Sequence, residues 1–349
     1  MKEYENGSNP FSLTFGKKPT EYIIRYENIN EIVSAFSDNP SRCQTYLIKG
    51  VRGSGKTVLM TAISKELAEK KEWICVDLNA SRDLTDDFAY RLSDVYRNVG
   101  DVFTRGFDLT VAGFGVGIGG SDDRDSISKC ERILEIAKQK GQKVLVTIDE
   151  VTNDLSMKQF ASQFQIWIRK DYPIYLLMTG LYENIDAIQN NPQLTFLLRS
   201  PKMTLGPLGS SQIARQYEEV FEMSSEQAIS LAKITKGYAF AFQALGMLVW
   251  DEPDYSKNDK VIRQLDDLLD DYVYRKIWTG LSGIDKNILL NMPDDKAIKV
   301  SDLYTATQIT PQSFSKYRER LMNRGLIRAV GHGYVELALP RFGSICKMY

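Results

Sequence analysis

Residues 46–60 read YLIKGVRGSGKTVLM and place a glycine-rich turn and a Lys-Thr pair between an apolar run and a helical pattern. Residues 50–57 match the spacing G-x-x-x-x-G-K-[ST] in full. Glycines let backbone N–H groups curl around phosphate oxygens, and the N-terminus of the following helix adds free N–H groups and the positive end of its dipole. The alternative is a glycine turn that carries Lys-Thr by chance. We predict a nucleotide-binding loop made of Gly50, Val51, Arg52, Gly53, Ser54, Gly55, Lys56, Thr57 and Val58.

Four side chains have the chemistry of phosphate transfer. Lys56 is placed to reach the β and γ phosphates, and the Thr57 hydroxyl is placed to ligand Mg²⁺. The apolar run 144–150, VLVTIDE, ends in two carboxylates, and ligands of parallel sheets lie beyond the carboxyl ends of the strands. Asp149 would then hold Mg²⁺, and Glu150 would polarise the attacking water. The alternative is an acidic strand end without a catalytic role.

Three more polar residues stand where they can assist this chemistry. Thr179, at the end of YLLMTG, can hydrogen-bond the γ-phosphate or the attacking water, or simply make a turn. Asn79, at the end of WICVDLN, can hydrogen-bond Glu150 and hold it off line until a partner binds. Arg199, in FLLRS, is a candidate arginine finger for a neighbouring subunit, and a solvated or structurally paired arginine is the alternative. We expect Arg52 to point away from the phosphate.

Residues 283–349 show three helical patterns and then a hairpin with glycines at its tip, which is the order of a winged helix. In the third pattern, TPQSFSKYRERLMNRG, Thr310 is the expected cap and Pro311 suits the first turn. The expected buried face of this helix consists of Phe314, Tyr317 and Leu321.

The remaining side chains of this segment are typical of a nucleic-acid surface. Residues 283–349 hold ten Lys/Arg against six Asp/Glu, a net charge of +4 within a chain of −1. The hairpin adds Arg328 and His332, and His332, between two glycines, is interpreted as a turn residue. DNA bound through residues 310–335 is the predicted partner, and a protein-binding or oligomerisation surface is the alternative. The helix side chains expected to reach phosphates or base edges are Gln312, Ser313, Lys316, Arg320 and Arg324.

The composition indicates a soluble globular protein of two or three domains. The chain has 349 residues, of which 43% are hydrophobic and 26% charged. Its four cysteines lie far apart, without disulfide or zinc spacing. Neither a signal-peptide pattern nor an apolar run of about 18 residues occurs, so we expect a cytoplasmic protein that does not enter a membrane.

The order of strand and helix patterns predicts an α/β fold. Strand patterns alternate with helical patterns up to about residue 200, which indicates a mostly parallel P-loop NTPase sheet with helices on both faces. The glycine-rich stretch 107–120 is expected to be a hairpin or a mobile loop. Three long helical segments then predict a lid. The predicted domains are an ATPase α/β domain (1–200), an α-helical lid (201–282) and a winged helix (283–349).

The motifs GVRGSGKT, LVTIDEV, LLMTG and FLLRS, followed by a helical lid and a winged helix, resemble the AAA+ ATPases. The resemblance is closer to the bacterial and archaeal ATPases related to the origin-recognition initiators and the STAND signalling ATPases. The N-terminal segment NPFSLTFGKKPTEYIIRYENINEI is similar to the entry segment of that group. The resemblance implies ATP and Mg²⁺ as ligands, with the adenine near Ile23 and Arg25. ATP rather than GTP is also favoured because no N-K-x-D motif stands on a suitable loop.

The lid departs from this pattern. Initiator relatives carry an arginine in the lid, and signalling relatives carry a proline after a glycine pair. The matching stretch here, 235–243 or TKGYAFAFQ, has neither, so that Lys236 or Arg215 would have to read the nucleotide.

Two functions remain open from the sequence. The first is a slow, Mg²⁺-dependent ATPase switch of AAA+ type, whose ATP or ADP state controls assembly, as a homo-oligomer or with a protein partner, and DNA engagement by the winged helix. The second is a STAND-like signalling or scaffold ATPase whose winged helix binds protein. A small-molecule kinase fits less well, because of the long C-terminal half and the Asp149–Glu150 pair.

Overall fold

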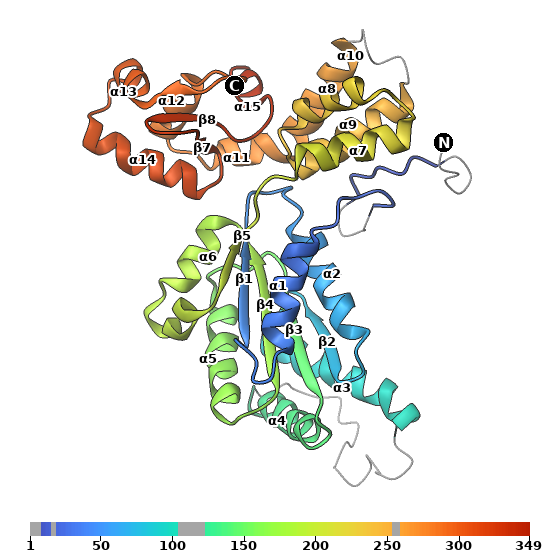
Figure 1. The fold of residues 1–349 in the computed structure, drawn as a ribbon. Helices are drawn as coiled ribbons and strands as arrows, with labels where there is room; N and C mark the ends of the chain where they lie inside the picture. The colour runs from blue at the N-terminus through green and yellow to red at the C-terminus, as the bar shows by residue number, and fades with distance from the viewer. Residues whose placement is uncertain (1–7, 15–18, 104–122, 253–258) are drawn as a thin grey trace. The chain divides into compact units, whose positions relative to one another are not determined.

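The computed structural model describes residues 8–14, 19–103, 123–252 and 259–349 (Figure 1). The chain divides into two compact units, and each has a hydrophobic core of its own. The first, here called the sheet unit, comprises residues 26–49 and 59–203. The second, here called the loop-and-lid unit, comprises residues 1–25, 50–58 and 204–349. The predicted phosphate loop therefore clusters with the C-terminal half of the chain.

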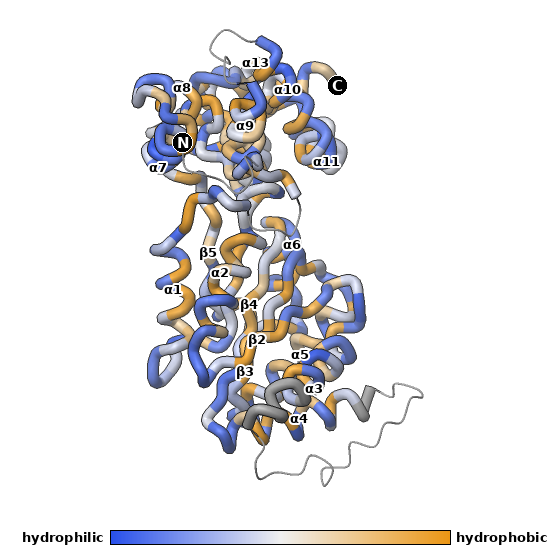
Figure 2. Tube along the Cα trace, turned by 90° about the vertical axis from the view of Figure 1, so that its right-hand side faces the viewer, coloured by the Kyte–Doolittle hydropathy of each residue, from blue (hydrophilic) through white to orange (hydrophobic). Residues whose placement is uncertain are grey.

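A five-stranded sheet in the order β2-β3-β4-β1-β5 lies at the centre of the sheet unit (Figure 1). Its pairs β1–β4, β2–β3 and β3–β4 are parallel. The interior strands β3 and β4 are apolar runs, as parallel strands covered on both faces require, and they appear as hydrophobic segments in Figure 2. The strands are β1 Thr45–Lys49, β2 Trp73–Leu78, β3 Lys143–Ile148, β4 Ile174–Gly180 and β5 Lys202–Thr204.

Helices flank this sheet, as the alternating sequence pattern predicts (Figure 1). In α5 the buried side chains recur every three or four positions, and Asp154 caps the helix by accepting from the Met157 amide at 2.8 Å. The predicted P-loop NTPase sheet with its helices is thus confirmed. The glycine-rich stretch 107–120 lies outside the described residues. The helices are α1 Tyr26–Ser37, α2 Lys56–Ala68, α3 Leu84–Phe103, α4 Asp123–Gln139, α5 Leu155–Arg169, α6 Tyr182–Gln189 and the 3₁₀ segment η2 Pro192–Arg199.

The lid is helical as predicted, but one predicted helix is two. The run from Ser224 to Trp250 breaks after α8, because Lys236 and Gly237 adopt φ of 47° and 77°. A Cβ at Gly237 would lie 2.5 Å from the Leu208 carbonyl oxygen, so the break also needs a glycine. The lid elements are α7 Ser210–Phe221, α8 Ser225–Thr235, α9 Ala239–Asp251, α10 Asp259–Leu269, the π-helical segment η4 Asp270–Tyr274 and α11 Arg275–Thr279.

The lid helices α7 and α8 begin with different kinds of N-cap. Ser224 forms the capping box of α8 with Gln227. Gly209 is the N-cap of α7, and Ser210 is already the first helical residue.

Residues 283–349, here called the C-terminal module, contain the three helices and the hairpin in the predicted order. Thr310 caps α14 and Pro311 is its first residue, while Phe314 and Leu321 are buried, as expected. A short strand and a final helix were not predicted, and the three strands pair antiparallel in the order β6-β8-β7. The elements are α12 Gly283–Leu290, β6 Ile298–Lys299, α13 Val300–Thr307, α14 Pro311–Asn323, β7 Ile327–Ala329, β8 Tyr334–Leu337 and α15 Phe342–Cys346.

The lid and the C-terminal module share one hydrophobic core within the loop-and-lid unit. Arg341 of the module pairs with Asp266 of α10, and Tyr274 of the lid donates to the Pro340 carbonyl at 2.7 Å. Among the described helices, none combines the length and the apolar character needed to cross a membrane. All four cysteines, which lie in the described part of the chain, are free, as their spacing predicts.

Candidate functional site

The predicted phosphate loop is a tight turn between β1 and α2. Lys49 ends β1, Gly50 follows it directly, and α2 begins at Lys56. Gly53 and Gly55 adopt φ of 74° and 92°, a region that side chains disfavour. A Cβ on Gly50 would stand 2.7 Å from the Ser54 hydroxyl. Gly53 and Gly55 are therefore required by the conformation of the backbone itself.

Polar groups line the inside of this turn. Lys56 is buried, and its Nζ donates to the carbonyl oxygens of Gly50 and Val51 at 3.1 and 2.9 Å. Ser54 is only 5% exposed, and its Oγ has no hydrogen-bond partner among the described residues. An orphaned buried hydroxyl is costly unless a ligand satisfies it. The turn is thus suited to an anion with several acceptor oxygens, such as a phosphate chain.

Arg25, which precedes α1, contacts the backbone of the phosphate loop. The Arg25 guanidinium donates to the Gly206 carbonyl at 2.8 Å and to the Ser54 carbonyl at 3.5 Å. Burial lowers the pKa of Arg25 from its ordinary value. Ile23 packs against the core of the loop-and-lid unit. The structure therefore places Arg25 as a support of the loop backbone, and the predicted contact of Ile23 and Arg25 with adenine stays a prediction.

The acidic pair lies at the carboxyl edge of the sheet. The Thr179 hydroxyl donates to Asp149 Oδ1, and the Glu150 amide donates to the same oxygen at 3.0 Å and to Thr179 Oγ1 at 3.4 Å. Glu150 adopts a left-handed φ of 53°, and its side chain is exposed. The register β1–β4 aligns Thr179 with Ile48, two residues before the phosphate loop. The structure thus brings Asp149, Glu150 and Thr179 together, as the sequence predicts.

Thr179 contacts the acidic pair directly. It is fully buried, and its hydroxyl donates to Asp149 and orients that carboxylate. Its predicted bond to the γ-phosphate or the attacking water stays a prediction. Asn79 was expected to bond Glu150, and this stays a prediction. Its Oδ1 accepts from the Ser81 amide at 2.9 Å, the local turn that asparagine favours at strand exits.

The two predicted lid cations, Lys236 and Arg215, are engaged in contacts within the protein. Lys236 donates to the carbonyl oxygens of Asp294 and Leu337 in the C-terminal module, and burial lowers its pKa. Arg215 pairs with Glu219 one turn along α7 at 2.9 Å. The candidate arginine finger Arg199 is exposed at the end of η2, without a hydrogen bond or ion pair among the described residues.

Sequence reasoning missed the residues of the lid that touch the loop. The Tyr238 hydroxyl donates to the Arg52 carbonyl at 2.6 Å, and the Phe240 amide donates to the Gly53 carbonyl at 3.0 Å. Both residues stand at the start of α9, directly after the helix break. The only signal in the sequence is the Lys-Gly pair, at which the chain leaves the helix.

The predicted DNA-reading helix is less free than its sequence indicates. Arg320 bonds Asp285, whose side chain is only 1% exposed, at 2.6 Å, and Arg324 donates to the Gly280 carbonyl at 3.2 Å. Of the five predicted contact residues, Gln312, Ser313 and Lys316 are exposed, and the two arginines are committed to contacts within the module.

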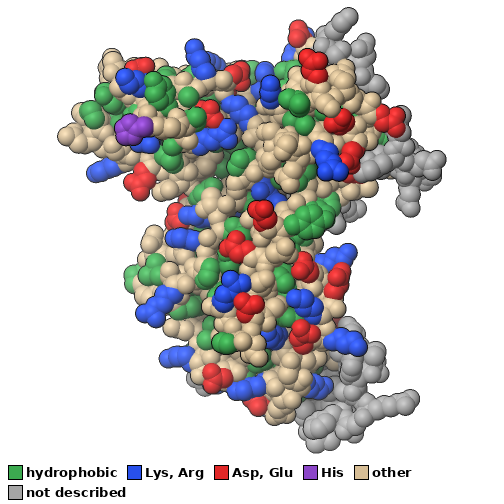
Figure 3. Space-filling model, viewed as in Figure 1, with side chains coloured by type: hydrophobic (Ala, Val, Ile, Leu, Met, Phe, Trp, Pro, Cys, Tyr) green, Lys and Arg blue, Asp and Glu red, His purple; other side chains and the backbone are tan. Residues whose placement is uncertain are grey.

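The hairpin of the module shows a similar division of roles. Arg328 pairs with Glu336 across the hairpin at 2.5 Å. His332 is exposed between Gly331 and Gly333, both of positive φ, and is a turn residue as predicted. On the face drawn in Figure 3, Lys/Arg and Asp/Glu side chains are intermingled, without a large patch of one sign.

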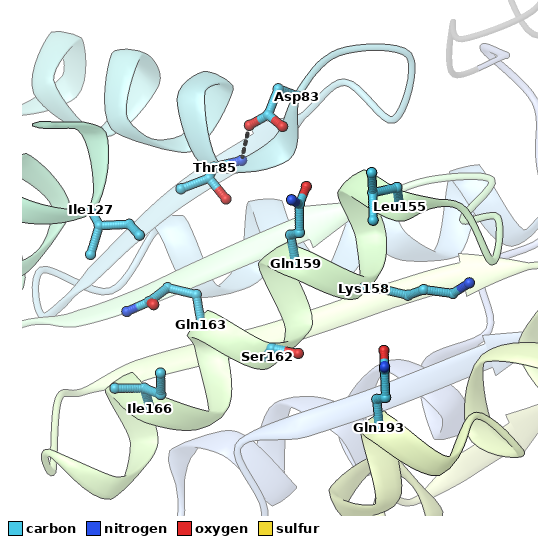
Figure 4. Close-up of a pocket in the computed structure, with 10 residues that line it drawn as sticks. All are labelled: Asp83, Thr85, Ile127, Leu155, Lys158, Gln159, Ser162, Gln163, Ile166 and Gln193. Carbon is cyan, nitrogen blue, oxygen red and sulfur yellow. Dashed lines mark hydrogen bonds between the residues drawn. The ribbon is translucent and has the colours of Figure 1, made fainter. Parts of the chain in front are cut away.

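A separate pocket of about 330 Å³ lies on the sheet unit. Most of its lining comes from one face of α5, including Gln159 and Gln163, and Ile127 of α4 closes another side (Figure 4). Asp83 on its rim accepts from the Thr85 amide at 3.0 Å and caps the start of α3. None of the predicted nucleotide-site residues lines this pocket.

Comparison of the structure with solved structures finds the same fold in several proteins. A Walker-type ATPase of Pyrococcus abyssi is 13% identical with a TM-score of 0.64, and the match covers 93% of this chain and 96% of that one. The ORC2 protein of Aeropyrum pernix, solved as ADPNP–ADP complexes, is 14% identical with a TM-score of 0.56 over 96% of each chain. Cdc6p of Pyrobaculum aerophilum is 11% identical with a TM-score of 0.50, also over 96% of each chain. The chain thus shares the P-loop NTPase fold of these proteins.

Sequence comparisons add one finding. A family model described as a domain of unknown function (DUF8462) matches residues 271–344. The matched stretch begins inside the π-helical segment η4 and includes nearly all of the C-terminal module. No curated protein matches the chain.

Proposed function

We propose that this protein is a Mg²⁺-dependent ATP-binding and hydrolysing switch, in which the nucleotide state of the phosphate loop controls what the C-terminal module binds. The observation that carries the proposal is the loop itself, with its glycine conformations and its unpartnered, buried Ser54 hydroxyl. Lys56 is buried at the same turn and would exchange its two loop carbonyls for phosphate oxygens. The fold shared with ATPases supports the same reading.

The residues of the acidic pair have separate roles in this proposal. Glu150 accepts the proton of the attacking water, or orients that water, because its exposed carboxylate follows a strand that ends at the ligand edge of the sheet. Thr179 holds Asp149 in place through its hydroxyl. A water oriented by Glu150 attacks the γ-phosphate, its proton passes to the carboxylate, and ADP leaves with inorganic phosphate as the second product.

Magnesium would be held by the Thr57 hydroxyl and the Asp149 carboxylate, because oxygen donors of this kind suit a hard cation. Within the described residues, no group of three or more His, Cys, Asp or Glu side chains is placed to hold a metal ion. This fits magnesium, which usually takes one or two protein ligands and completes its shell with water and phosphate oxygens. When bound, the ion neutralises charge on the β and γ phosphates.

Exchange of Glu150 for glutamine tests the catalytic assignment. In Glu150→Gln, the affinity for ATP should stay within about threefold, while hydrolysis falls about 100-fold, since the amide cannot accept a proton. Affinity is measured with a fluorescent nucleotide and turnover by phosphate release. Glu135→Gln, an exposed change of the same kind on α4, is the matched control. Unchanged turnover in Glu150→Gln would remove Glu150 from the mechanism.

DNA is the partner that we propose for the C-terminal module. Its order of helices and antiparallel strands is that of a winged helix, and exposed Gln312, Ser313 and Lys316 stand on the first half of α14. A protein partner is the second candidate, and one observation favours it. The arginines Arg320 and Arg328 are paired with carboxylates inside the module, which lowers its capacity to neutralise phosphates.

A further inference from the structure

The start of α9 holds two consecutive peptide groups of the phosphate loop, through the Tyr238 hydroxyl on the Arg52 carbonyl and the Phe240 amide on the Gly53 carbonyl. A peptide group is planar, so the Arg52 carbonyl and the Gly53 N–H turn together, and so do the Gly53 carbonyl and the Ser54 N–H. These N–H groups are the ones that a phosphate-binding turn offers to its ligand. The lid therefore binds these two peptide groups through their carbonyl oxygens, opposite to the N–H groups that a phosphate would contact.

Transfer of a loop N–H to a phosphate would turn one of these planes. The Ser54 N–H now donates to the Val51 carbonyl at 3.3 Å. Its transfer to a phosphate oxygen rotates the plane that also carries the Gly53 carbonyl, which is the acceptor of Phe240. No side chain can take the place of the Gly53 hydrogen, because a Cβ there would collide with the Tyr238 hydroxyl and come within 3.0 Å of the Phe240 Cβ.

Tyr238 also touches the residues that join the lid to the C-terminal module. Its ring stacks on that of Tyr274, with centroids 6.4 Å apart and an angle of 24° between the planes. Tyr274 packs edge-on against Phe342 of α15 at 4.9 Å and donates to the Pro340 carbonyl at 2.7 Å. All three aromatic residues are buried. Tyr274 ends a π-helical turn, a rare geometry that occurs frequently at functional sites.

A second connection runs beside the first. Lys236, two residues before Tyr238, donates to the Asp294 and Leu337 carbonyls of the module. Burial raises the pKa of Tyr238, so its hydroxyl stays protonated and remains a donor well above neutral pH. The five residues 236–240 thus contact the phosphate loop on one side and the C-terminal module on the other.

We propose that Tyr238 is a positioning residue for the phosphate loop and that, through Tyr274, it transmits the occupancy of the loop to the C-terminal module. The inference rests on the proposed nucleotide binding. The lid of this chain binds the loop backbone through the Tyr238 hydroxyl and the Phe240 amide. In the proposal, these contacts take the place of a lid cation that binds the phosphate. Because coupling between sites is reciprocal, a partner on the module changes nucleotide affinity by the same factor as nucleotide changes partner affinity.

Hydrogen exchange of the full chain tests the proposal without a known partner. Amide exchange is measured without nucleotide, with ADP, and with a non-hydrolysed ATP analogue plus Mg²⁺. In the unaltered protein, exchange should change in peptides from the loop and in peptides covering residues 334–346. In Tyr238→Phe the change at 334–346 should be lost, while the Kd for the analogue shifts by about tenfold at most, the equivalent of one hydrogen bond.

Another buried tyrosine of the same core provides the matched control. The Tyr217 hydroxyl donates to the Phe242 carbonyl at 2.7 Å, and Tyr217 is as buried as Tyr238. Tyr217→Phe should lower the thermal stability by a similar amount and keep the response at 334–346. Tyr274→Phe, which loses only the bond to Pro340, should weaken that response and serves as a second variant if Tyr238→Phe does not fold.

The outcomes separate this proposal from the proposed function. A folded Tyr238→Phe protein that binds the analogue and keeps the full response at 334–346 overturns the inference. An unaltered protein that binds the analogue without any change at 334–346 overturns it as well, and leaves nucleotide binding intact. Failure of the unaltered protein to bind ADP or the analogue in a separate titration rejects the proposed function, and the inference with it.

Discussion

The phosphate loop and helix α14 carry the residue types that their predicted ligands require, yet the two regions use them differently. In the loop, the Ser54 hydroxyl is buried without a partner among the described residues, and Lys56 donates to two backbone carbonyls of the same loop. In α14, Arg320 is bound to the buried carboxylate of Asp285 and donates to the Ser282 hydroxyl at 2.9 Å. The loop thus contains a buried hydroxyl without a partner among the described residues, whereas the arginines of α14 hold the module together.

This difference shows that the type and position of a residue do not by themselves make it available. A hydrogen-bonding group that is already paired must lose that partner before it can bind a ligand, and the loss subtracts from affinity. For Arg320, release would leave the carboxylate of Asp285 buried and unpaired. Three variants test the comparison, in order of the expected effect.

Lys56→Ala should have the largest effect, a loss of nucleotide affinity of about 100-fold. The ammonium makes charge-assisted bonds to phosphate, each worth about 1.5–3 kcal/mol. Affinity is measured by titration with a fluorescent ATP analogue. Lys65→Ala, an exposed lysine further along α2, should bind as the unaltered protein does. Equal affinities for the two variants would show that the loop is not the nucleotide site.

Arg320→Ala should lower the free energy of unfolding by about 2 kcal/mol. Removal of one partner of a fully buried ion pair costs about 3–5 kcal/mol, and Arg320 itself is 44% exposed, which reduces the cost. Urea denaturation gives the value. Lys316→Ala, on the same helix but exposed, should change stability by about 0.5 kcal/mol or less. If Arg320→Ala were equally neutral, the contrast between loop and helix would disappear.

Lys316→Ala should have the smallest effect, a drop of about threefold in DNA affinity. Loss of one phosphate contact reduces the slope of log affinity against log salt by about one. Gel shifts with duplex DNA over a range of salt concentrations measure both quantities, with Lys65→Ala as control. If the unaltered protein binds no DNA at low salt, with or without ATP, the protein-partner candidate replaces the DNA proposal.

Much of the fold could be predicted from the sequence, because local patterns determine it. Apolar runs predict β3 and β4, and the Gly-Lys-Thr motif predicts where the turn ends and α2 begins. Thr310 and Pro311 predict the start of α14. The three-residue strand β5 and the two-residue strand β6 carry too few residues for a pattern. The break at Lys236–Gly237 was missed because the apolar residues on its two sides keep a helical spacing.

The candidate site divides in the same way. The loop and the pair Asp149 and Glu150 could be predicted because each lies within one local pattern, a glycine-rich motif and the end of an apolar run. The partners that decide availability are distant, since Arg320 and Asp285 are 35 residues apart and Tyr238 lies 186 residues beyond Arg52. Such pairs form only in the folded chain, and no spacing in the sequence marks them. The predicted domain boundaries at about 200 and 282 stay predictions.

The division of the chain into its two units has a mechanical consequence. The chain passes from one unit to the other after residues 25, 49, 58 and 203, so that residues 50–58 are joined at both ends to the sheet unit. By its contacts the same segment clusters with the lid and the C-terminal module. The phosphate loop is therefore covalently joined to the sheet unit at both ends, while its hydrogen bonds to Tyr238 and Phe240 belong to the loop-and-lid unit.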